Sequence, residues 1–404
     1  MGRTTRGRRE PHLPRVEKIE LSDSHVKGRV AAAVILLTAG VALIVFSLTN
    51  FLSADAGWQE IEADAGNALH CGEDFTLLYE LGREDVSANA EKRELTSLYS
   101  DAAKTAYEIF NADVEIEGIA NLWYINHHPN EEVTVDAALY KALSQVCEDG
   151  GRWIYLGPAY SVYDNLFYMT SADGAVDFDP RLNPYVGTLF QEISKWANDP
   201  EAVNLELLED NVIRLNVSGE YLDFMEEEEL QNFIDFYWLK NAFIADYMAD
   251  RLLAEGYTHG MISSYDGFVR CFDGSGTAFS YQIYHMQEDT PILSEVMEYT
   301  GPQSFVTFRS YPLNPLDLHH YLTFSDGSVR TPYLSLKDGL DRCAAAELTV
   351  YSQSAGCTEI ALKAAPIYIA DQFDVSALTS LKMADIFALY WKGGEIQNNS
   401  LLLP

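Results

Sequence analysis

The chain has 404 residues, and 48% of them are hydrophobic, which is enough to bury the core of one large domain or of two moderate ones. Its formal net charge at pH 7 is −34, from 61 acidic and 27 basic residues. A surface this negative repels nucleic acid and anionic lipid headgroups, so we expect no nucleic-acid partner. Residues 1–29 are the exception, because they carry eight Lys or Arg against four Asp or Glu.

The first hydrophobic segment has the length of a membrane span. Residues 30–54 contain no charged side chain, and a helix that crosses a bilayer needs ~20 apolar residues. The positive-inside rule then makes residues 1–29 a basic cytoplasmic arm. We therefore expect a single-pass signal anchor at residues 30–52, a location in the cell membrane and an extracytoplasmic C-terminal domain. The competing interpretation is a signal peptide that is cleaved at the small-x-small site of residues 54–56.

Five cysteines follow the predicted anchor. They are Cys71, Cys147, Cys271, Cys343 and Cys357. In an oxidising compartment they allow up to two disulfides with one thiol left over, and the sequence leaves the pairing open. Their spacing, alone or with histidine, does not indicate a zinc site.

Hydrophobic periodicity predicts both helices and strands after an acidic stalk at residues 53–72. The expected strands are Phe75–Leu81, Val212–Val217, Met261–Ile262 and Phe268–Cys271, and the expected helices are Glu91–Phe110, Asp136–Cys147 and Trp238–Ala254. The last helix has a broad apolar face, and Gly256 stands where a left-handed C-cap residue is wanted. Residues 235–267 thus predict a helix, a tight stop and a strand, around which the rest of the chain is organised.

This stretch resembles the signature segment of the bacterial FAD:protein FMN transferases, the ApbE family. The family segment reads D-L-G-G-I-A-K-G-Y-A-V-D and is followed by a strand that ends in a Gly-Gly pair. Without a gap, Asp235 falls on the first Asp, Leu239 on the Ile, Phe243 on the Tyr and Asp246 on the last Asp. The outline of the family segment is therefore present.

The chemistry of the segment differs from that of the family. Tyr237 and Trp238 replace the first Gly-Gly pair, Asn241 replaces the Lys, and Asp266 replaces the first glycine of the second pair. Glycine lets a backbone approach a ligand closely, and larger side chains remove that space.

Three further stretches carry the resemblance. Residues 319–327 fall on the family pattern H-H-I-I-D-P-x-T-G, in which a histidine near the FAD pyrophosphate could assist proton transfer. Residues 171–180 resemble S-x-G-A-F-D-P-T, with Asp177 on the family Asp. Thr307 begins a third stretch, T-F-R-S-Y, where the family has T-S-G-x-Y and where Phe308 and Arg309 fill space that small residues leave free.

The family's magnesium position is also altered. Residues 347–351 resemble a family strand, and the family helix that follows reads D-A-L-A-T, whose Asp and Thr bind magnesium. Here Glu359 keeps a carboxylate, but Lys363 replaces the Thr and offers no oxygen ligand. Lys363 either takes the place of the metal charge beside a pyrophosphate, or forms an i,i+4 ion pair with Glu359.

The resemblance implies an α+β, two-lobed ApbE-like domain at residues 73–404, with an insertion at about residues 150–170. In the family, FAD and magnesium bind in a cleft between the lobes, and FMN is transferred to a Thr or Ser hydroxyl of a target protein. Carried over residue by residue, the catalytic candidates are His319, His320 and Lys240, the cofactor-binding candidates are Asp177, Asn241, Asp246, Ser264, Thr307 and Lys363, and the metal candidate is Glu359.

The sequence leaves three functions open. The first is a degenerate protein of this type, altered at the magnesium and flavin sites, that binds flavin, a nucleotide or a protein partner at the membrane surface. The second is an active flavin transferase in which Lys240 and Lys363 hold the FAD pyrophosphate, with a membrane or exported flavoprotein as its target. The third is an extracytoplasmic small-molecule-binding protein that uses the aromatic-rich residues 153–167 as a lid.

Overall fold

The computed structural model describes residues 55–64, 71–83, 87–169, 172–287, 290–313 and 320–401, which belong to one compact unit that begins at Ala54. The predicted anchor at residues 30–52 and the basic arm before it lie outside the described residues. Within the described ranges, every helix is too short or too polar to cross a membrane.

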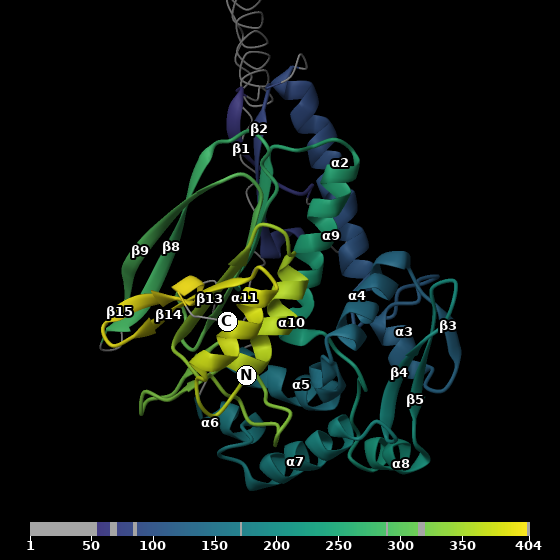
Figure 1. Cartoon of the computed structure of the whole chain (residues 1–404). Coiled ribbons are helices and arrows are strands. Elements are labelled where there is room, and N and C mark those ends of the chain that lie inside the picture. The colour runs from purple at the N-terminus through teal and green to yellow at the C-terminus, as the bar shows by residue number, and fades with distance from the viewer. Residues whose placement is uncertain are drawn as a thin grey trace, which may run out of the picture. The chain divides into compact units, whose positions relative to one another are not determined.

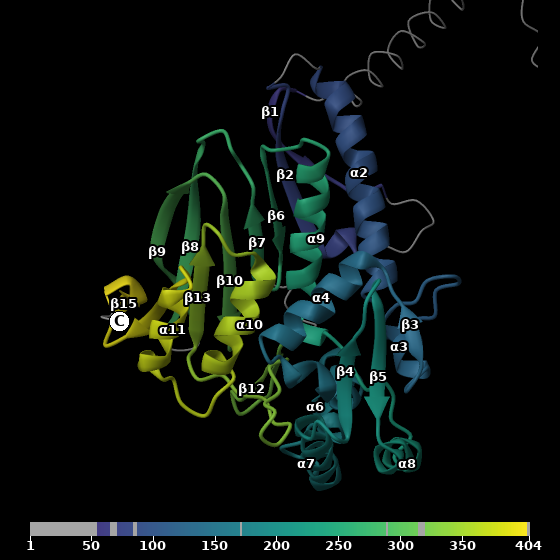
Figure 2. The same cartoon turned by 45° about the vertical axis from the view of Figure 1, so that its right-hand side comes forward.

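The largest sheet among the described residues has eight strands, and every neighbouring pair is antiparallel (Figure 1 and Figure 2). In spatial order the strands are β1 (Gly57–Ile61), β2 (Phe75–Leu81), β6 (Gly260–Ser264), β7 (Phe268–Cys271), β10 (Gln303–Arg309), β13 (Glu347–Ser352), β14 (Phe387–Lys392) and β15 (Glu395–Asn398). β1 lies within residues 53–72, so this part of the expected stalk is a strand of the central sheet.

Among the described residues, three long helices pack on this sheet, and the short α11 (Leu378–Met383) also contacts β14. The long helices are α2 (Ala88–Ile109), α9 (Lys240–Ala254) and α10 (Cys357–Tyr368). α2 contacts β1 and β2, α9 contacts β6 and β7, and α10 contacts β10 and β13. α9 also contacts both α2 and α10, so it occupies the middle of the helical layer (Figure 2).

A second group of elements contains a three-stranded sheet in the order β3 (Glu132–Thr134), β5 (Val212–Val217) and β4 (Val203–Leu207). Its helices are α3 (Leu122–His127), α4 (Ala137–Glu148), α5 (Gly157–Tyr163), α6 (Ala172–Ala175), α7 (Pro184–Asn198) and α8 (Gly219–Glu227). The remaining elements are the hairpin of β8 (Ala278–Gln287) and β9 (Thr290–Thr300), the pair β11 (Leu322–Thr323) and β12 (Val329–Arg330), and α11 (Leu378–Met383). The mixture of helices with antiparallel sheets confirms the expected α+β class.

The elements expected from hydrophobic periodicity are present. β2 and β5 have the predicted bounds, and α2 and α4 differ from prediction by one to three residues at their ends. The predicted helix at residues 238–254 begins instead with the 3₁₀ turn η5 (Tyr237–Leu239), and the α-helix starts at Lys240. All five cysteines are free thiols in this structure.

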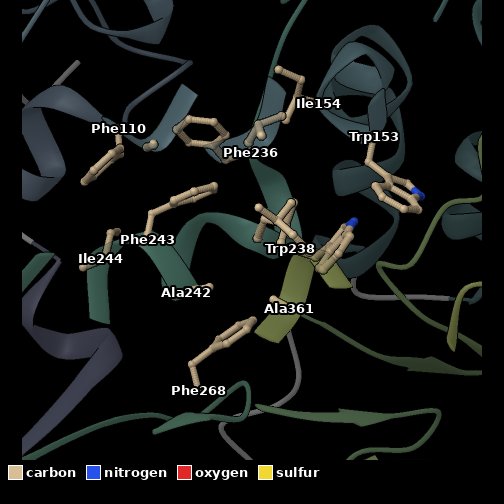
Figure 3. Close-up of a cluster of buried hydrophobic side chains, with 14 of the residues drawn as sticks. Phe110, Trp153, Ile154, Phe236, Trp238, Ala242, Phe243, Ile244, Phe268 and Ala361 are labelled. Carbon is tan, nitrogen blue, oxygen red and sulfur yellow. The ribbon is translucent and has the colours of Figure 1, made fainter. Parts of the chain in front are cut away.

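An aromatic cluster joins the start of α9 to the second group of elements (Figure 3). The ring centroids of Phe236 and Phe243 lie 4.4 Å apart, and Phe110, which follows α2, lies 6.0 Å from Phe236. Trp238 packs edge to face with Trp153 at 6.3 Å. These side chains are at most 8% exposed, so their packing holds three chain segments that are distant in sequence against one another.

The aromatic-rich insertion is part of the core. It folds as the 3₁₀ turn η2 (Arg152–Leu156), then α5, then the 3₁₀ turn η3 (Asp164–Tyr168). Tyr160 is 1% exposed and Tyr163 is fully buried. The segment is therefore packed against the core in this structure, and its expected role as a lid stays a prediction.

Gly157 lets α5 approach the chain that precedes α9. A Cβ atom at this position would lie 2.1 Å from the carbonyl oxygen of Asn232, which is closer than any real contact. We expect Gly157→Ala to lower the free energy of unfolding by about 1–3 kcal/mol, the usual cost of forcing extra atoms into a packed core. Urea denaturation measures this change.

The matched control is Gly219→Ala at the first position of α8, where a Cβ atom would meet nothing within 4 Å. This variant should be as stable as the parent or slightly more stable, because alanine is the better helix former. Equal effects of the two substitutions would contradict a steric role for Gly157.

Candidate functional site

A cavity of about 570 Å³ lies at the N-terminal end of α9. Its walls come from η1 (Gly72–Asp74), the chain after α2, α5, η3, the segment that leads into α9, and the turn between β6 and β7. The aromatic cluster brings these segments together, since Phe110 and Trp238 belong both to the cluster and to the cavity wall. The volume falls within the range of small-molecule sites.

Carboxylates dominate the polar wall. The cavity is lined by Asp74, Asp113, Asp164, Asp235 and Asp266. Among the described residues, none of the five forms an ion pair; each accepts a hydrogen bond from a neutral donor. Among the described residues, their negative charge is therefore not neutralised by a direct ion pair.

Two tyrosines hold carboxylates in place. The hydroxyl of Tyr265 donates to Asp74 at 3.1 Å, and the hydroxyl of Tyr237 donates to Asp164 at 3.2 Å. The backbone N–H of Tyr237 also donates to Asp235 at 2.9 Å. Tyr237 therefore holds the carboxylates of both Asp164 and Asp235.

Tyr237 has an unusual backbone. Its φ is +44°, in the left-handed region that favours glycine, and the resemblance places it on a glycine of the family segment. Such a conformation costs of order 1 kcal/mol or more for a residue with a bulky side chain. The ring stacks on Tyr160 at 4.4 Å, and this packing together with the hydrogen bond to Asp164 holds the strained residue in place.

Lys240 is the single lysine among the described residues of the wall. Its side chain is exposed to solvent within the cavity, although protein surrounds it on most sides. Burial alone would lower the pKa of this ammonium group, but the carboxylates of Asp235, Asp74 and Asp113 raise the pKa above its ordinary value. Lys240 therefore stays charged and offsets only part of the negative charge.

Burial raises the pKa values of several carboxyl groups in the cavity wall. Burial raises the pKa of Asp235 from 3.8 to about 6, and the neighbouring charge of Asp113 adds to the shift. Burial likewise raises the pKa values of Asp164 and Asp266. Carboxyl groups whose ionised form is disfavoured in this way are typical of binding and catalytic cavities.

Two acceptor oxygens of the wall have no donor among the described residues. Nδ2 of Asn241 donates to Oδ2 of Asp266 at 2.9 Å, and this bond leaves Oδ1 of Asn241 and Oδ1 of Asp266 without partners. Nδ1 of His320 likewise has no partner within the described part of the chain, and its ring packs against Tyr265 with the centroids 5.5 Å apart. An unpaired buried polar atom costs about 1–3 kcal/mol, which a ligand could recover.

The structure brings together three of the residues that the resemblance selected. Lys240, Asn241 and His320 line the cavity. His319 lies outside the described residues. Asp177 is exposed and belongs to η4 (Val176–Phe178), away from the cavity wall.

Asp246 belongs to α9, and its carboxylate lies at the N-terminal end of α10. Its carboxylate accepts hydrogen bonds from the backbone N–H groups of Cys357 at 2.9 Å and Thr358 at 2.8 Å, and Arg270 lies 3.6 Å away. A carboxylate in this position satisfies the free donors of the helix N-terminus and interacts favourably with the helix dipole. In this chain Asp246 therefore ties α9 to α10.

Ser264 and Thr307 lie inside the sheet. The hydroxyl of Ser264 accepts from the N–H of Phe268 at 3.0 Å, which closes the β6–β7 turn. Thr307 is bonded to the hydroxyls of Tyr281 at 2.7 Å and Thr349 at 3.1 Å. Both residues support the framework, and neither lines the cavity.

The glycine that closes the β6–β7 turn is a structural requirement. Gly267 has φ +108°, and a Cβ atom there would lie 2.5 Å from the carbonyl oxygen of Thr307. This is the second glycine of the pair that the resemblance identified, and it is kept where the first has become Asp266.

Glu359 and Lys363 lie on α10, and neither lines the cavity. The ammonium group of Lys363 bonds to Asp149 at 2.9 Å and lies 3.9 Å from Glu359. The ion pair that the sequence left open is present, with Asp149 as the closer partner. Over the part of the chain that the structure describes, no group of three or more His, Cys, Asp or Glu could hold a metal ion.

Sequence analysis did not select several residues of the wall. Asp74 and Asp113 lie outside every motif, and the composition of their surroundings gives no sign of a site. Asp164 and Tyr168 belong to the insertion, whose richness in aromatic residues was the only signal.

No protein-family model and no curated protein sequence matches the chain. Solved structures, however, match the chain. The ApbE protein of Thermotoga maritima matches with a TM-score of 0.57 and 13% identity, over 84% of this chain and 96% of that one. The flavin transferase ApbE of Vibrio cholerae matches with a TM-score of 0.52 and 12% identity, over 85% and 97%. The chain therefore has the ApbE fold, and identities this low establish the fold alone.

Asp246→Ala should lower the free energy of unfolding by about 2 kcal/mol, because two helix N–H groups and Arg270 lose their acceptor. Asp246→Asn keeps one acceptor oxygen and should cost less. Urea denaturation of both variants measures the difference. An Asp246→Ala protein with unchanged stability would contradict the capping role.

Asp235→Asn should stabilise the protein at pH 7.5 by ~2 kcal/mol, because it removes a carboxylate whose ionisation is disfavoured in the folded state. Asp113 and Asp164 oppose this ionisation and Lys240 favours it. As the pH falls from 6 to 4, the folded protein takes up a proton that the unfolded chain does not, so the destabilisation disappears. The gain should thus vanish near pH 4 in urea denaturation, and an equal gain at both pH values would refute the assignment.

Proposed function

We propose that this protein is an extracytoplasmic small-molecule-binding protein with the ApbE fold, anchored through residues 30–52, that does not transfer FMN. The observation that carries the proposal is the cavity wall, where, among the described residues, five carboxylates without ion pairs face one lysine. Such a wall repels the pyrophosphate of FAD, because like charges in a partly desolvated site interact strongly.

The residues present do not fit FAD. The positions that the resemblance assigns to glycines carry Tyr237, Trp238 and Asp266, so side chains fill the space in which a backbone could approach a phosphate. Tyr237 is held there by its ring stacking and by its hydrogen bond to Asp164. The cavity that remains beside these side chains is lined with carboxylates.

The residues present do not fit magnesium either. The carboxylate of Glu359 has the ammonium group of Lys363 beside it, and Lys363 is held by Asp149. A fixed positive charge at this place opposes a divalent cation. We therefore derive no catalytic step through FAD or magnesium.

One observation favours the alternative, an active flavin transferase acting on a membrane or exported flavoprotein. Lys240 and His320 lie in the same cavity, and both belong to the set that the resemblance identifies as catalytic. A lysine can hold a phosphate as a point charge, and a histidine can transfer a proton. An FMN-transfer assay decides between this alternative and the small-molecule-binding function.

The test is an FMN-transfer assay. The full-length protein is incubated with FAD, magnesium and a threonine-containing acceptor peptide, and the peptide is examined for flavin fluorescence on a denaturing gel. We expect a dark band, while the Vibrio cholerae flavin transferase with its own acceptor serves as the positive control. A fluorescent peptide that depends on this protein would establish the transferase function and overturn the proposal.

A further inference from the structure

We infer that the cavity at the start of α9 binds a small organic cation that carries a protonated amino group on an apolar or aromatic body. This inference rests on the proposed small-molecule-binding function and names the class of ligand. It is carried by the charge of the wall, by unpartnered acceptor atoms at one place in it, and by its aromatic surfaces.

The charge of the wall selects a cation. Its five aspartates receive hydrogen bonds only from neutral groups among the described residues, and Lys240 acts electrostatically on four of them without an ion pair among those residues. Protein interiors disfavour buried charges that lack an opposite partner. A cationic ligand would supply a partner that the described residues provide only in part, through Lys240.

A second, independent observation indicates a ligand with N–H donors. Asn241 lines the cavity, its side chain is 5% exposed, and its Oδ1 has no hydrogen-bond partner among the described residues. Oδ1 of Asp266 is unpartnered as well, and the two side chains are joined by their 2.9 Å hydrogen bond. Two neighbouring acceptors, one of them on a carboxylate, suit a protonated amino group, which has several N–H donors.

The aromatic wall suits the body of such a ligand. Tyr160 and Tyr237 stack at 4.4 Å, and Tyr168, which also lines the cavity, is 58% exposed. Aromatic faces attract cations and bury apolar groups. An inorganic cation such as magnesium or calcium would use neither property. It would instead need a set of oxygen ligands arranged around it.

The experiment is a calorimetric titration of the full-length protein with 2-phenylethylamine at pH 7.5. The matched probe is the N,N,N-trimethyl form of the same compound, which keeps the charge and the ring but lacks N–H donors. We expect the amine to bind at least tenfold more tightly than the trimethylated compound. Equal binding of the two would overturn the requirement for N–H donors.

Two variants localise the site. Asp266→Asn removes the charge at the acceptor pair, and Asn241→Leu removes the amide oxygen at similar volume. Each should weaken amine binding at least tenfold. Asp223→Asn is the control, because it makes the same change in net charge at an exposed position on α8, outside the cavity. Equal affinity in Asp266→Asn and the control would overturn the proposed location.

Circular dichroism establishes that each variant is folded. If Asp266→Asn does not fold, Asp235→Asn takes its place, since it removes another carboxylate of the wall and is expected to be more stable than the parent. Unchanged amine affinity in that variant would likewise count against the inference.

Titrations with FAD and with magnesium chloride separate this inference from the proposed function. Tighter binding of FAD without FMN transfer would overturn the cationic ligand class and leave a small-molecule-binding protein. Binding of magnesium alone would also overturn the organic-cation class. Absence of binding by every probe would overturn the inference, whereas FMN transfer to a peptide would overturn the proposed function itself.

Discussion

The cavity depends on the aromatic packing that holds the chain just before α9. Phe236 and Phe243 pack on Phe110, and Trp238 packs on Trp153, so the segment is locked between the end of α2 and the insertion. This packing also holds Tyr237 in a left-handed backbone conformation that a tyrosine rarely adopts. Because aromatic side chains bury large areas, such a cluster can offset both that strain and the crowding of nearby carboxylates.

The framework residues and the cavity residues of this stretch compare differently with the family segment. Asp246 and Gly267 occupy family positions, and each has an architectural role here: Asp246 caps α10, and Gly267 passes within contact of the Thr307 backbone. Tyr237, Trp238 and Asp266 occupy family glycine positions, and all three line the cavity. At these five positions, the residues that support the framework match the family segment, and those that line the cavity differ from it.

Two groups of charged residues, one on α10 and one in the cavity, are separated in the fold. Lys363 lies on α10 and is held by Asp149 and Glu359, so its charge is compensated there. Lys240 lies in the cavity among carboxylates that outnumber it. The chain thus compensates its positive charge where the family places a metal and leaves negative charge where the family binds a phosphate. Under the proposed function, this distribution would favour a cationic ligand over a phosphate.

Patterns within the sequence predict the local elements and part of the site. Periodicity placed β2, β5 and most of α9, because local burial patterns depend on residues that are close in sequence. The resemblance selected Lys240, Asn241 and His320, which do lie together. Only the tertiary structure decided that Asp74, Asp113 and Asp164 join them, since these aspartates come from separate elements and meet through the packing of Phe110 and Trp238. It likewise decided that Asp246 caps a helix more than 100 residues away, because long-range contacts arise from packing and leave no local pattern in the chain.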